Sequence, residues 1–394
     1  MTSARVFESS YGGEGKFSIL LAEWLSRQDF RVTVIGSTFM NVRAANATSF
    51  KDIQNKQNSN KNINIKKVSP PYFIYSTSRL IMSFLWILKL ISINRSFKVD
   101  LIHAQDTGYA GLAAVIAGRI LKLPVVITSH GIRHITISSQ LKGRLKGIFV
   151  WSEKKLDIFT CKHADLVTAV SINVKQYLEN LSHREIDMIP LPIDIAKFDY
   201  SDTNRFDVRK EFGIEPSREV VIGFVGRLVP VKNPFVLLSS FSQLIRAHRS
   251  AVLLIVGTGP LESKMKEFCS EKMIEKNVIF CGARNDVGRI LSAIDIFILP
   301  STVEGMPTVI LEAMACRRAI IASDIPANNK IIENGKEGLL FAPQDISSLT
   351  ESIEILIKNS SLRNSLGMNA MLKVKDFDIS KVLPKMLRCY HQLL

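Results

Sequence analysis

Two glutamates, Glu304 and Glu312, stand eight residues apart in the segment IFILPSTVEGMPTVILEAMA, residues 296–315. The apolar run Ile296–Leu299 predicts a strand buried on both faces, and Pro307 suits the first turn of a helix. Glu304 is therefore expected in a loop and Glu312 inside the helix. Open α/β sheets bind ligands where the carboxyl end of a strand leads into a helix, and the N–H groups of that helix end favour anions.

Carboxylates beside an anion site are consistent with a nucleotide sugar. Carboxylates accept hydrogen bonds from vicinal hydroxyls, while cations and N–H groups hold a diphosphate. Taken alone, the two glutamates are explained more simply as a solvated loop residue and a surface helix residue. The neighbouring motifs decide between the two interpretations.

The segment GFVGRLVPVKNP, residues 223–234, places Arg227 and Lys232 on a loop after a predicted strand. Gly226 permits close approach of the backbone at the turn. Two cations converging at the end of a strand would neutralise the charge that grows on a departing diphosphate. The alternative is that both are solvated surface cations.

Three further turns follow predicted strands or open helices. IVGTGP, residues 255–260, contains Gly257, and FCGARND, residues 280–286, contains Ala283 and Arg284. YGGEGKF, residues 11–17, opens a helix with Gly12 and Gly13, but it lacks the Gly-Lys-Ser/Thr of a Walker A loop. His130 ends a predicted buried strand in TSHGIR and precedes a glycine, which is expected to place it in a cleft. His103 and Asp106 in LIHAQD are weaker candidates.

In this order the segments resemble the motifs of family 4 glycosyltransferases. The two glutamates, Glu304 and Glu312, match the Glu-x7-Glu motif of that family. The resemblance implies a GT-B fold: two Rossmann-like, doubly wound α/β domains facing across a cleft, with the acceptor on the N-terminal side. It also implies a retaining sugar transfer from a nucleotide diphosphate sugar, with no cofactor. Because Arg227, Lys232 and the helix N-terminus would neutralise the diphosphate, the transfer is expected to be metal-independent. The acceptor class stays open among glycans, lipid-linked molecules and small molecules.

The resemblance also implies residue roles. Arg227 and Lys232 would contact the donor phosphates, Glu312 the ribose hydroxyls, and Glu304 with the backbone of Gly305 and Met306 the sugar. His130 would hydrogen-bond the transferred sugar, which makes His130, Glu304, Arg227 and Lys232 the catalytic candidates. The other donor-binding candidates are Gly12, Gly13, Gly226, Gly257, Ala283, Arg284, Pro307 and Thr308.

The chain departs from the family pattern in three places. IPLPID stands at the linker, Arg317 and Arg318 stand where the helix usually ends in glycine, and DIPANN lacks the usual glycine pair. Asp376-Phe377-Asp378 spells D-x-D, a metal motif in another glycosyltransferase fold. It follows a predicted helix without supporting ligands, so no metal site is expected.

Alternating strands and helices organise the chain into two units. Domains are expected at residues 1–195 and 196–375, with a C-terminal helix in residues 376–394 that packs back toward the first domain. Predicted strands in the first domain include Val32–Ile35, Val99–His103, Val125–Thr128 and Leu166–Val170. Residues 41–67 are rich in Asn, Lys and Ser and are predicted to be irregular.

The charge is concentrated in the first half. The net charge is +15; residues 1–195 contain 25 Lys and Arg against 14 Asp and Glu, a net of +11. No nucleic-acid-binding motif accompanies this excess, so an anionic membrane surface is the better partner. Leu80–Ile93 predicts a buried helix, with a membrane-surface helix as the alternative because Arg79, Lys89, Arg95 and Lys98 surround it.

Five scattered cysteines without a C-x-x-C predict reduced thiols and a cytoplasmic setting. The first twenty residues do not have the pattern of a signal peptide. Two rival functions remain: a nucleotide-sugar 2-epimerase of the same fold, against which the Glu-x7-Glu run argues, and a non-catalytic nucleotide-sugar-binding partner subunit. Loss of Glu304, His130 or Lys232 would favour the second, and all three are present.

Overall fold

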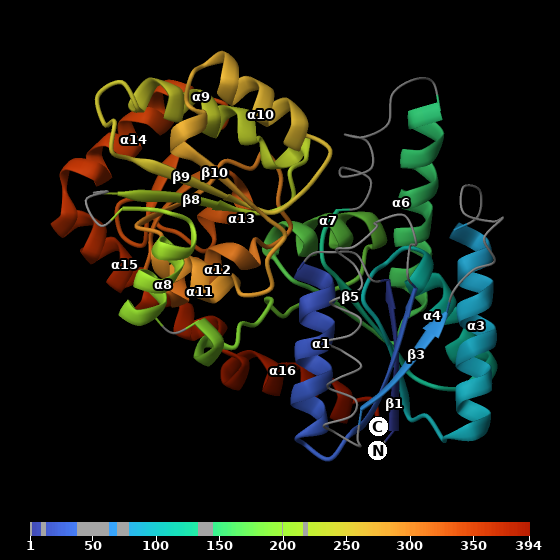
Figure 1. Cartoon of the computed structure of the whole chain (residues 1–394). Helices are drawn as coiled ribbons and strands as arrows, with labels where there is room; N and C mark the ends of the chain where they lie inside the picture. The colour runs from blue at the N-terminus through green and yellow to red at the C-terminus, as the bar shows by residue number, and fades with distance from the viewer. Residues whose placement is uncertain are drawn as a thin grey trace. The chain divides into compact units, whose positions relative to one another are not determined.

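The computed structural model describes residues 2–8, 13–37, 63–68, 79–132, 145–198, 200–215 and 220–394. The chain divides into two compact units, Met1–Pro192 with Ser380–Leu394, and Ile193–Ile379. The boundaries predicted from the sequence, after residues 195 and 375, lie close to these divisions. In each unit helices pack on a parallel sheet (Figure 1), which is the doubly wound α/β architecture predicted from the sequence.

The sheet of the first unit has the order β3-β2-β1-β4-β5-β6-β7 among the described strands. These strands are β1 (Thr2–Glu8), β2 (Arg31–Ser37), β3 (Ile63–Val68), β4 (Leu101–Ala104), β5 (Val125–Ser129), β6 (Leu166–Ala169) and β7 (Asp187–Met188). The described helices are α1 (Gly13–Ser26), α3 (Arg79–Ser96), α4 (Tyr109–Leu121), α6 (Leu145–His163), α7 (Ile172–Ser182) and α16 (Ile379–His391).

Strand β3 corrects the prediction that residues 41–67 are irregular. Ile63 and Ile65 alternate with polar residues, and the strand pairs in parallel with β2 from Val32 to Ser37. An edge strand can be largely polar because its stability comes from backbone pairing with its neighbour. Residues 41–62 lie outside the described part of the chain.

The sheet of the second unit has the order β10-β9-β8-β11-β12-β13. Its strands are β8 (Val221–Val225), β9 (Val252–Val256), β10 (Val278–Gly282), β11 (Ile296–Leu299), β12 (Ala319–Ser323) and β13 (Leu339–Phe341). Its helices are α8 (Asp202–Glu211), α9 (Pro234–Leu244), α10 (Glu262–Glu271), α11 (Val287–Ala293), α12 (Thr308–Ala315), α13 (Pro326–Asn329), α14 (Ile346–Lys358) and α15 (Ser360–Val374). Apolar runs fill β8, β9 and β11, which are buried throughout their length.

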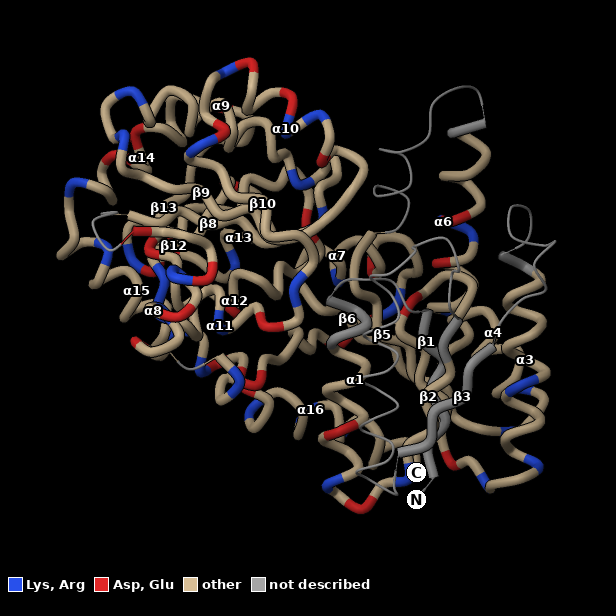
Figure 2. The backbone as a smooth tube through the Cα atoms, viewed as in Figure 1, with Lys and Arg blue, Asp and Glu red and all other residues tan. Residues whose placement is uncertain are grey.

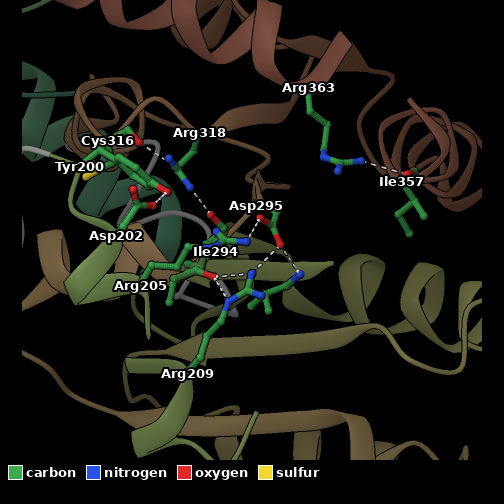
Figure 3. Close-up of polar contacts among 12 residues, drawn as sticks. Tyr200, Asp202, Arg205, Arg209, Ile294, Asp295, Cys316, Arg318, Ile357 and Arg363 are labelled. Carbon is green, nitrogen blue, oxygen red and sulfur yellow. Dashed lines mark hydrogen bonds and ion pairs between the residues drawn. The ribbon is translucent and has the colours of Figure 1, made fainter. Parts of the chain in front are cut away.

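A cluster of arginines explains one departure from the family pattern (Figure 3). Arg318 is buried and donates from Nη1 to the Ile294 carbonyl at 2.6 Å and from Nε to the Cys316 carbonyl at 2.6 Å. Arg205 and Arg209 both contact the Asp295 carboxylate at 2.7 Å, which also accepts from the Val221 N–H. The cluster therefore ties α8 and the end of α12 to the start of β8.

The C-terminal helix α16 packs within the first unit. The Tyr390 hydroxyl lies 2.7 Å from Nδ1 of His103, whose Nε2 lies 2.7 Å from the Thr128 hydroxyl. A further hydrogen bond of 2.8 Å joins Thr128 to Thr168. His103, Thr128 and Thr168 belong to β4, β5 and β6. This chain of hydrogen bonds therefore joins the helix to the middle of the sheet.

Helix α3 is buried on one face and exposed on the other. Trp86, Leu90 and Ile93 are buried, whereas Ile81, Phe84 and Leu88 are exposed at helical spacing. The expectation of a helix buried on all sides is thus corrected to a helix with an exposed apolar stripe. In the described residues no helix is long and apolar enough to cross a membrane.

Candidate active site

The loops after β8 and β11 form the centre of the candidate site in the second unit. These strands are neighbours at the point where the strand order reverses, which is where doubly wound sheets bind ligands. The Thr302 N–H donates to the Val231 carbonyl at 2.9 Å and ties the two loops together. Lys232 Nζ lies 2.5 Å from Glu304 Oε1, and both side chains are largely buried. The structure thus brings two predicted site residues into direct contact.

Arg227 has a different environment from Lys232. It lies two residues after the end of β8 and is exposed, whereas Lys232 ends a short 3-10 helix, Pro230–Lys232. Asn233 adopts a left-handed conformation (φ 50°) between that turn and α9. One predicted phosphate contact is therefore held by a carboxylate and the other is accessible.

The glycine turns after β8, β9 and β10 pack against one another. The Gly226 N–H donates to the Val256 carbonyl at 2.9 Å, and the Gly257 N–H donates to the Gly282 carbonyl at 2.7 Å. A Cβ at Gly257 would lie 1.9 Å from the Gly226 carbonyl oxygen, and φ there is +130°. Gly257 is therefore required for packing, whichever ligand binds beside it.

Helix α12 carries the second glutamate of the motif. It begins at Thr308, with Pro307 as the residue before its first turn rather than inside it. Glu312 lies one turn into the helix and is buried. Met306 packs against the core, while Gly305 and Thr308 are partly exposed. The solvated surface glutamate considered for this position is excluded.

The predicted base contacts follow β10. Ala283 is exposed. The Arg284 guanidinium lies 2.8 Å from carboxylate oxygens of Glu211 and of Asp286 and stands over the Phe212 ring at 5.6 Å. Hydrogen bonds from Arg284 lower the pKa of Asp286, and those carboxylates raise the pKa of Arg284. The guanidinium of Arg284 is thus fixed in place by its own neighbours.

His130 follows β5 in the first unit and is buried, with 7% of its surface exposed. Its Nε2 lies 3.0 Å from Oε1 of Gln105, and its ring packs against Phe17 of α1 with centroids 5.3 Å apart. Burial lowers the pKa of His130 to about 3, so the ring is neutral. Gly13 begins α1, while Gly12 lies outside the described residues.

The two weaker candidates of the first unit have structural partners. Both ring nitrogens of His103 are hydrogen-bonded, as described for α16, and the residue is fully buried. Asp106 Oδ1 accepts from the Gly108 N–H at 2.5 Å and caps the turn before α4. Gln105, between them, was not predicted. Its position two residues after His103 was the available signal, because alternate strand residues point to the same face.

Asp376 lies inside a 3-10 turn, Lys375–Phe377, and Asp378 stands between that turn and the start of α16. Asp376 contacts Lys373 at 3.7 Å and is exposed. No group of three or more His, Cys, Asp or Glu side chains with metal-binding geometry occurs in the described part of the chain.

Two family models match nearly all of this architecture. Glycosyltransferase Family 4 matches residues 11–197, and Glycosyl transferases group 1 matches residues 205–373. The fold and the two matches define a sugar-transferring enzyme of the GT-B class. The chain belongs to the family 4 glycosyltransferases.

Curated relatives are glycosyltransferases of several kinds. An Escherichia coli UDP-Gal:alpha-D-GlcNAc-diphosphoundecaprenol alpha-1,3-galactosyltransferase is 28% identical over 77% of this chain and 78% of its own. A Streptococcus pneumoniae alpha-monoglucosyldiacylglycerol synthase is 27% identical over 70% of this chain and 63% of its own.

Solved structures share the fold. Anabaena HepE in complex with UDP and glucose has a TM-score of 0.83 and 20% identity, with both chains fully covered. WaaG, a glycosyltransferase involved in lipopolysaccharide biosynthesis, has a TM-score of 0.75 and 15% identity, with 99% of each chain covered.

Proposed function

We propose that this glycosyltransferase moves a sugar from a nucleotide diphosphate sugar to a glycan, lipid-linked or small-molecule acceptor, with retention of anomeric configuration and without a metal ion. The contact between Lys232 and Glu304 carries the proposal. It places a cation suited to a diphosphate beside a carboxylate suited to sugar hydroxyls, at the switch point of the second sheet.

The proposed roles follow the two sides of this contact. Arg227 and Lys232 neutralise the charge that develops on the diphosphate as the sugar leaves. Glu304, with the backbone of Gly305 and Met306, holds the sugar, and Glu312 on α12 binds the ribose hydroxyls. Pro307 and Thr308 lead into the N-terminus of α12, whose N–H groups favour an anion.

The remaining donor contacts are proposed at the neighbouring turns. Ala283 and Arg284 line the base, with Arg284 fixed by Glu211 and Asp286. Gly226 and Gly257 form the wall of the nucleotide pocket, where a larger residue at Gly257 would displace the backbone. In the first unit His130 hydrogen-bonds the transferred sugar, and Gly12 and Gly13 allow the chain to approach the donor.

The names of relatives support the substrate classes. The Escherichia coli relative is named for a UDP-galactose donor and a diphosphoundecaprenol acceptor, and the Streptococcus pneumoniae relative is named for a diacylglycerol product. HepE was solved with UDP and glucose. A nucleotide-sugar donor and a lipid-linked acceptor are the substrates we infer first.

We further infer that the first unit binds an anionic membrane surface from the cytoplasmic side. Helix α3 contains no acidic residue (Figure 2), and its exposed stripe includes Phe84, which is 58% exposed. Helix α6 exposes Trp151 at 62%, while its two acidic residues, Glu153 and Asp157, are buried. Helix α4 packs against both α3 and α6 (Figure 1). Apolar and cationic side chains without exposed carboxylates suit an anionic lipid surface.

A donor screen tests the proposed activity. UDP-, GDP- and ADP-sugars are each offered with polyprenyl-diphosphate saccharides, diacylglycerol and soluble saccharides, and nucleotide release is measured. We expect acceptor-dependent release with one nucleotide, and NMR of the product should show the donor's anomeric configuration. An inverted product would contradict retention. An epimerised sugar released without acceptor would instead identify the 2-epimerase.

A further inference from the structure

Gln105 and His130 meet at the carboxyl ends of two neighbouring strands. Gln105 follows β4, His130 follows β5, and these strands pair in parallel. Both side chains are buried, and the Gln105 amide oxygen lies 3.0 Å from His130 Nε2. One step lower, His103 and Thr128 form a second pair on the same two strands. The sheet therefore carries two stacked polar layers, one of which reaches the edge where ligands bind.

The two layers differ in how completely they are hydrogen-bonded. In the lower layer both ring nitrogens of His103 have partners, Tyr390 and Thr128. In the upper layer Gln105 Nε2 and His130 Nδ1 are buried, and neither has a hydrogen-bond partner among the described residues. Buried polar groups are normally satisfied, and two adjacent exceptions call for an explanation. A ligand that supplies both missing hydrogen bonds is such an explanation.

The chemistry of the two atoms selects the ligand. With Gln105 Oε1 as acceptor, His130 carries its proton on Nε2, so Nδ1 offers a lone pair. Gln105 Nε2 offers an N–H donor. An anion could not donate to Nδ1, and an ammonium group could not accept from the amide. A hydroxyl group can do both.

The neutral state of the ring supports the same choice. Burial, with Phe17 against one side of the ring, holds the pKa of His130 near 3. The ring is therefore uncharged at the pH of an enzyme assay, and it does not attract the phosphates of the donor. Sugar hydroxyls are the neutral donors and acceptors that a glycosyltransferase substrate supplies.

We propose that Gln105 is a positioning and specificity residue. It holds His130 in the tautomer that carries the proton on Nε2. One hydroxyl group of a sugar substrate then donates to His130 Nδ1 and accepts from the Gln105 amide N–H. The proposal rests on the proposed function, which supplies the sugar substrate. It assigns Gln105 a role through His130 as well as a contact of its own. A residue that only supported packing would set neither the proton position of His130 nor the choice of sugar.

The first test measures the tautomer of His130 by nitrogen-15 NMR of the full chain labelled at histidine. The wild type should show Nε2 protonated. Gln105→Glu should keep that form, because a carboxylate accepts only, whereas Gln105→Leu should lose the preference. A proton on Nδ1 in the wild type, or unchanged signals in Gln105→Leu, would overturn the proposal. This measurement needs no turnover, so it decides the pairing even if no donor is transferred.

The second test compares the donor and its monodeoxy analogues in transfer or donor hydrolysis. Gln105→Leu should lower kcat/KM by about 10-fold or more with the complete sugar, the scale of one lost hydrogen bond. For one deoxy analogue the wild type should fall by a similar factor, and Gln105→Leu should cause little further loss. If the loss from Gln105→Leu and the loss from the missing hydroxyl multiplied for every deoxy analogue, Gln105 would contact none of these hydroxyl groups and the proposal would be refuted. Failure of the wild type with every donor would count against the proposed function instead.

Discussion

Lys232 Nζ and Glu304 Oε1 lie 2.5 Å apart across the loops that follow β8 and β11. The two residues are 72 positions apart in the chain, and parallel pairing of β8 with β11 brings their loops to the same edge. Glu304 thus balances the charge of Lys232, the residue proposed to contact the donor diphosphate. Donor binding is expected to replace this ion pair with contacts to substrate.

The first prediction concerns Lys232. Lys232→Ala should lower kcat for sugar transfer by ~10²-fold or more, the cost of removing one stabiliser of transition-state charge. Steady-state kinetics with the donor identified in the screen measures it. Lys266→Ala is a matched control, because Lys266 also pairs with a glutamate, Glu262 at 2.8 Å, but lies on α10. Unchanged turnover in Lys232→Ala would place the diphosphate elsewhere.

The order of strands explains why these residues could be predicted to lie together. The apolar runs of β8 and β11 indicate parallel strands, and the carboxyl ends of such strands share one edge of the sheet. The sequence did not predict that Lys232 and Glu304 contact each other directly. Their side-chain pairing depends on loop geometry, fixed in part by the Thr302 and Val231 hydrogen bond.

Other features depended on contacts distant in sequence. Strand β3 has a polar composition that resembles a loop, and only its pairing with β2 makes it a strand. The partner of His130 is 25 residues away, and the contact of Tyr390 with His103 spans 287 positions. Arg317 stands where the family has glycine, and it adopts a left-handed conformation with φ 58°. This conformation is common at the end of a helix and is the one that favours glycine there.

The second prediction separates donor affinity from turnover. Glu312→Ala should raise the donor KM by about 10- to 100-fold with a small change in kcat, because ribose contacts are similar in the ground and transition states. Glu312→Gln keeps the side-chain shape on α12 and serves as the matched control, with a smaller rise in KM. A defect confined to kcat would contradict the ribose assignment.

The third prediction follows from the buried, neutral His130. Its pKa is about 3 in the folded chain against 6.5 for an ordinary histidine, so between these values the unfolded chain binds the proton and the folded chain does not. The free energy of unfolding should therefore fall as pH drops below 6.5, by about 1.4 kcal/mol per pH unit from this group. Well above pH 6.5 His130 is neutral in both the folded and the unfolded chain, so it no longer lowers the free energy of unfolding.

Urea denaturation of the wild type and of His130→Asn at pH 7 and pH 5 measures this effect. The wild type should lose about 2 kcal/mol more than the variant over this interval. The other titrating groups are common to both proteins and cancel in the difference. Equal losses would mean that His130 is protonated or solvent-accessible in the folded chain.

The fourth prediction is that transfer survives chelation. In the proposed mechanism Arg227 and Lys232 supply the positive charge that a divalent ion would otherwise provide to the diphosphate. Activity in excess EDTA should match that in buffer alone, measured as nucleotide release with a saturating acceptor. Loss of activity that magnesium or manganese restores would contradict the metal-free mechanism and would revive the Asp376 and Asp378 pair.

The fifth prediction is salt-sensitive binding of the chain to anionic vesicles through its first unit. Each basic residue near an anionic surface contributes about 1 kcal/mol, and the attraction weakens as salt shortens the screening length. Co-sedimentation should therefore be strong with anionic vesicles at low salt and lost at high salt. It should fall when the four cations at Arg79, Lys89, Arg95 and Lys98 are changed to glutamine together.

The exposed aromatic side chains provide an independent variant. Phe84→Ser with Trp151→Ser should weaken sedimentation without changing net charge, because these side chains would bury apolar area at the interface. Met273→Ser is the matched control, since Met273 is 85% exposed in the second unit. Equal sedimentation with neutral and anionic vesicles, or none with either at low salt, would refute membrane binding. A soluble saccharide acceptor would then be favoured over a lipid-linked one.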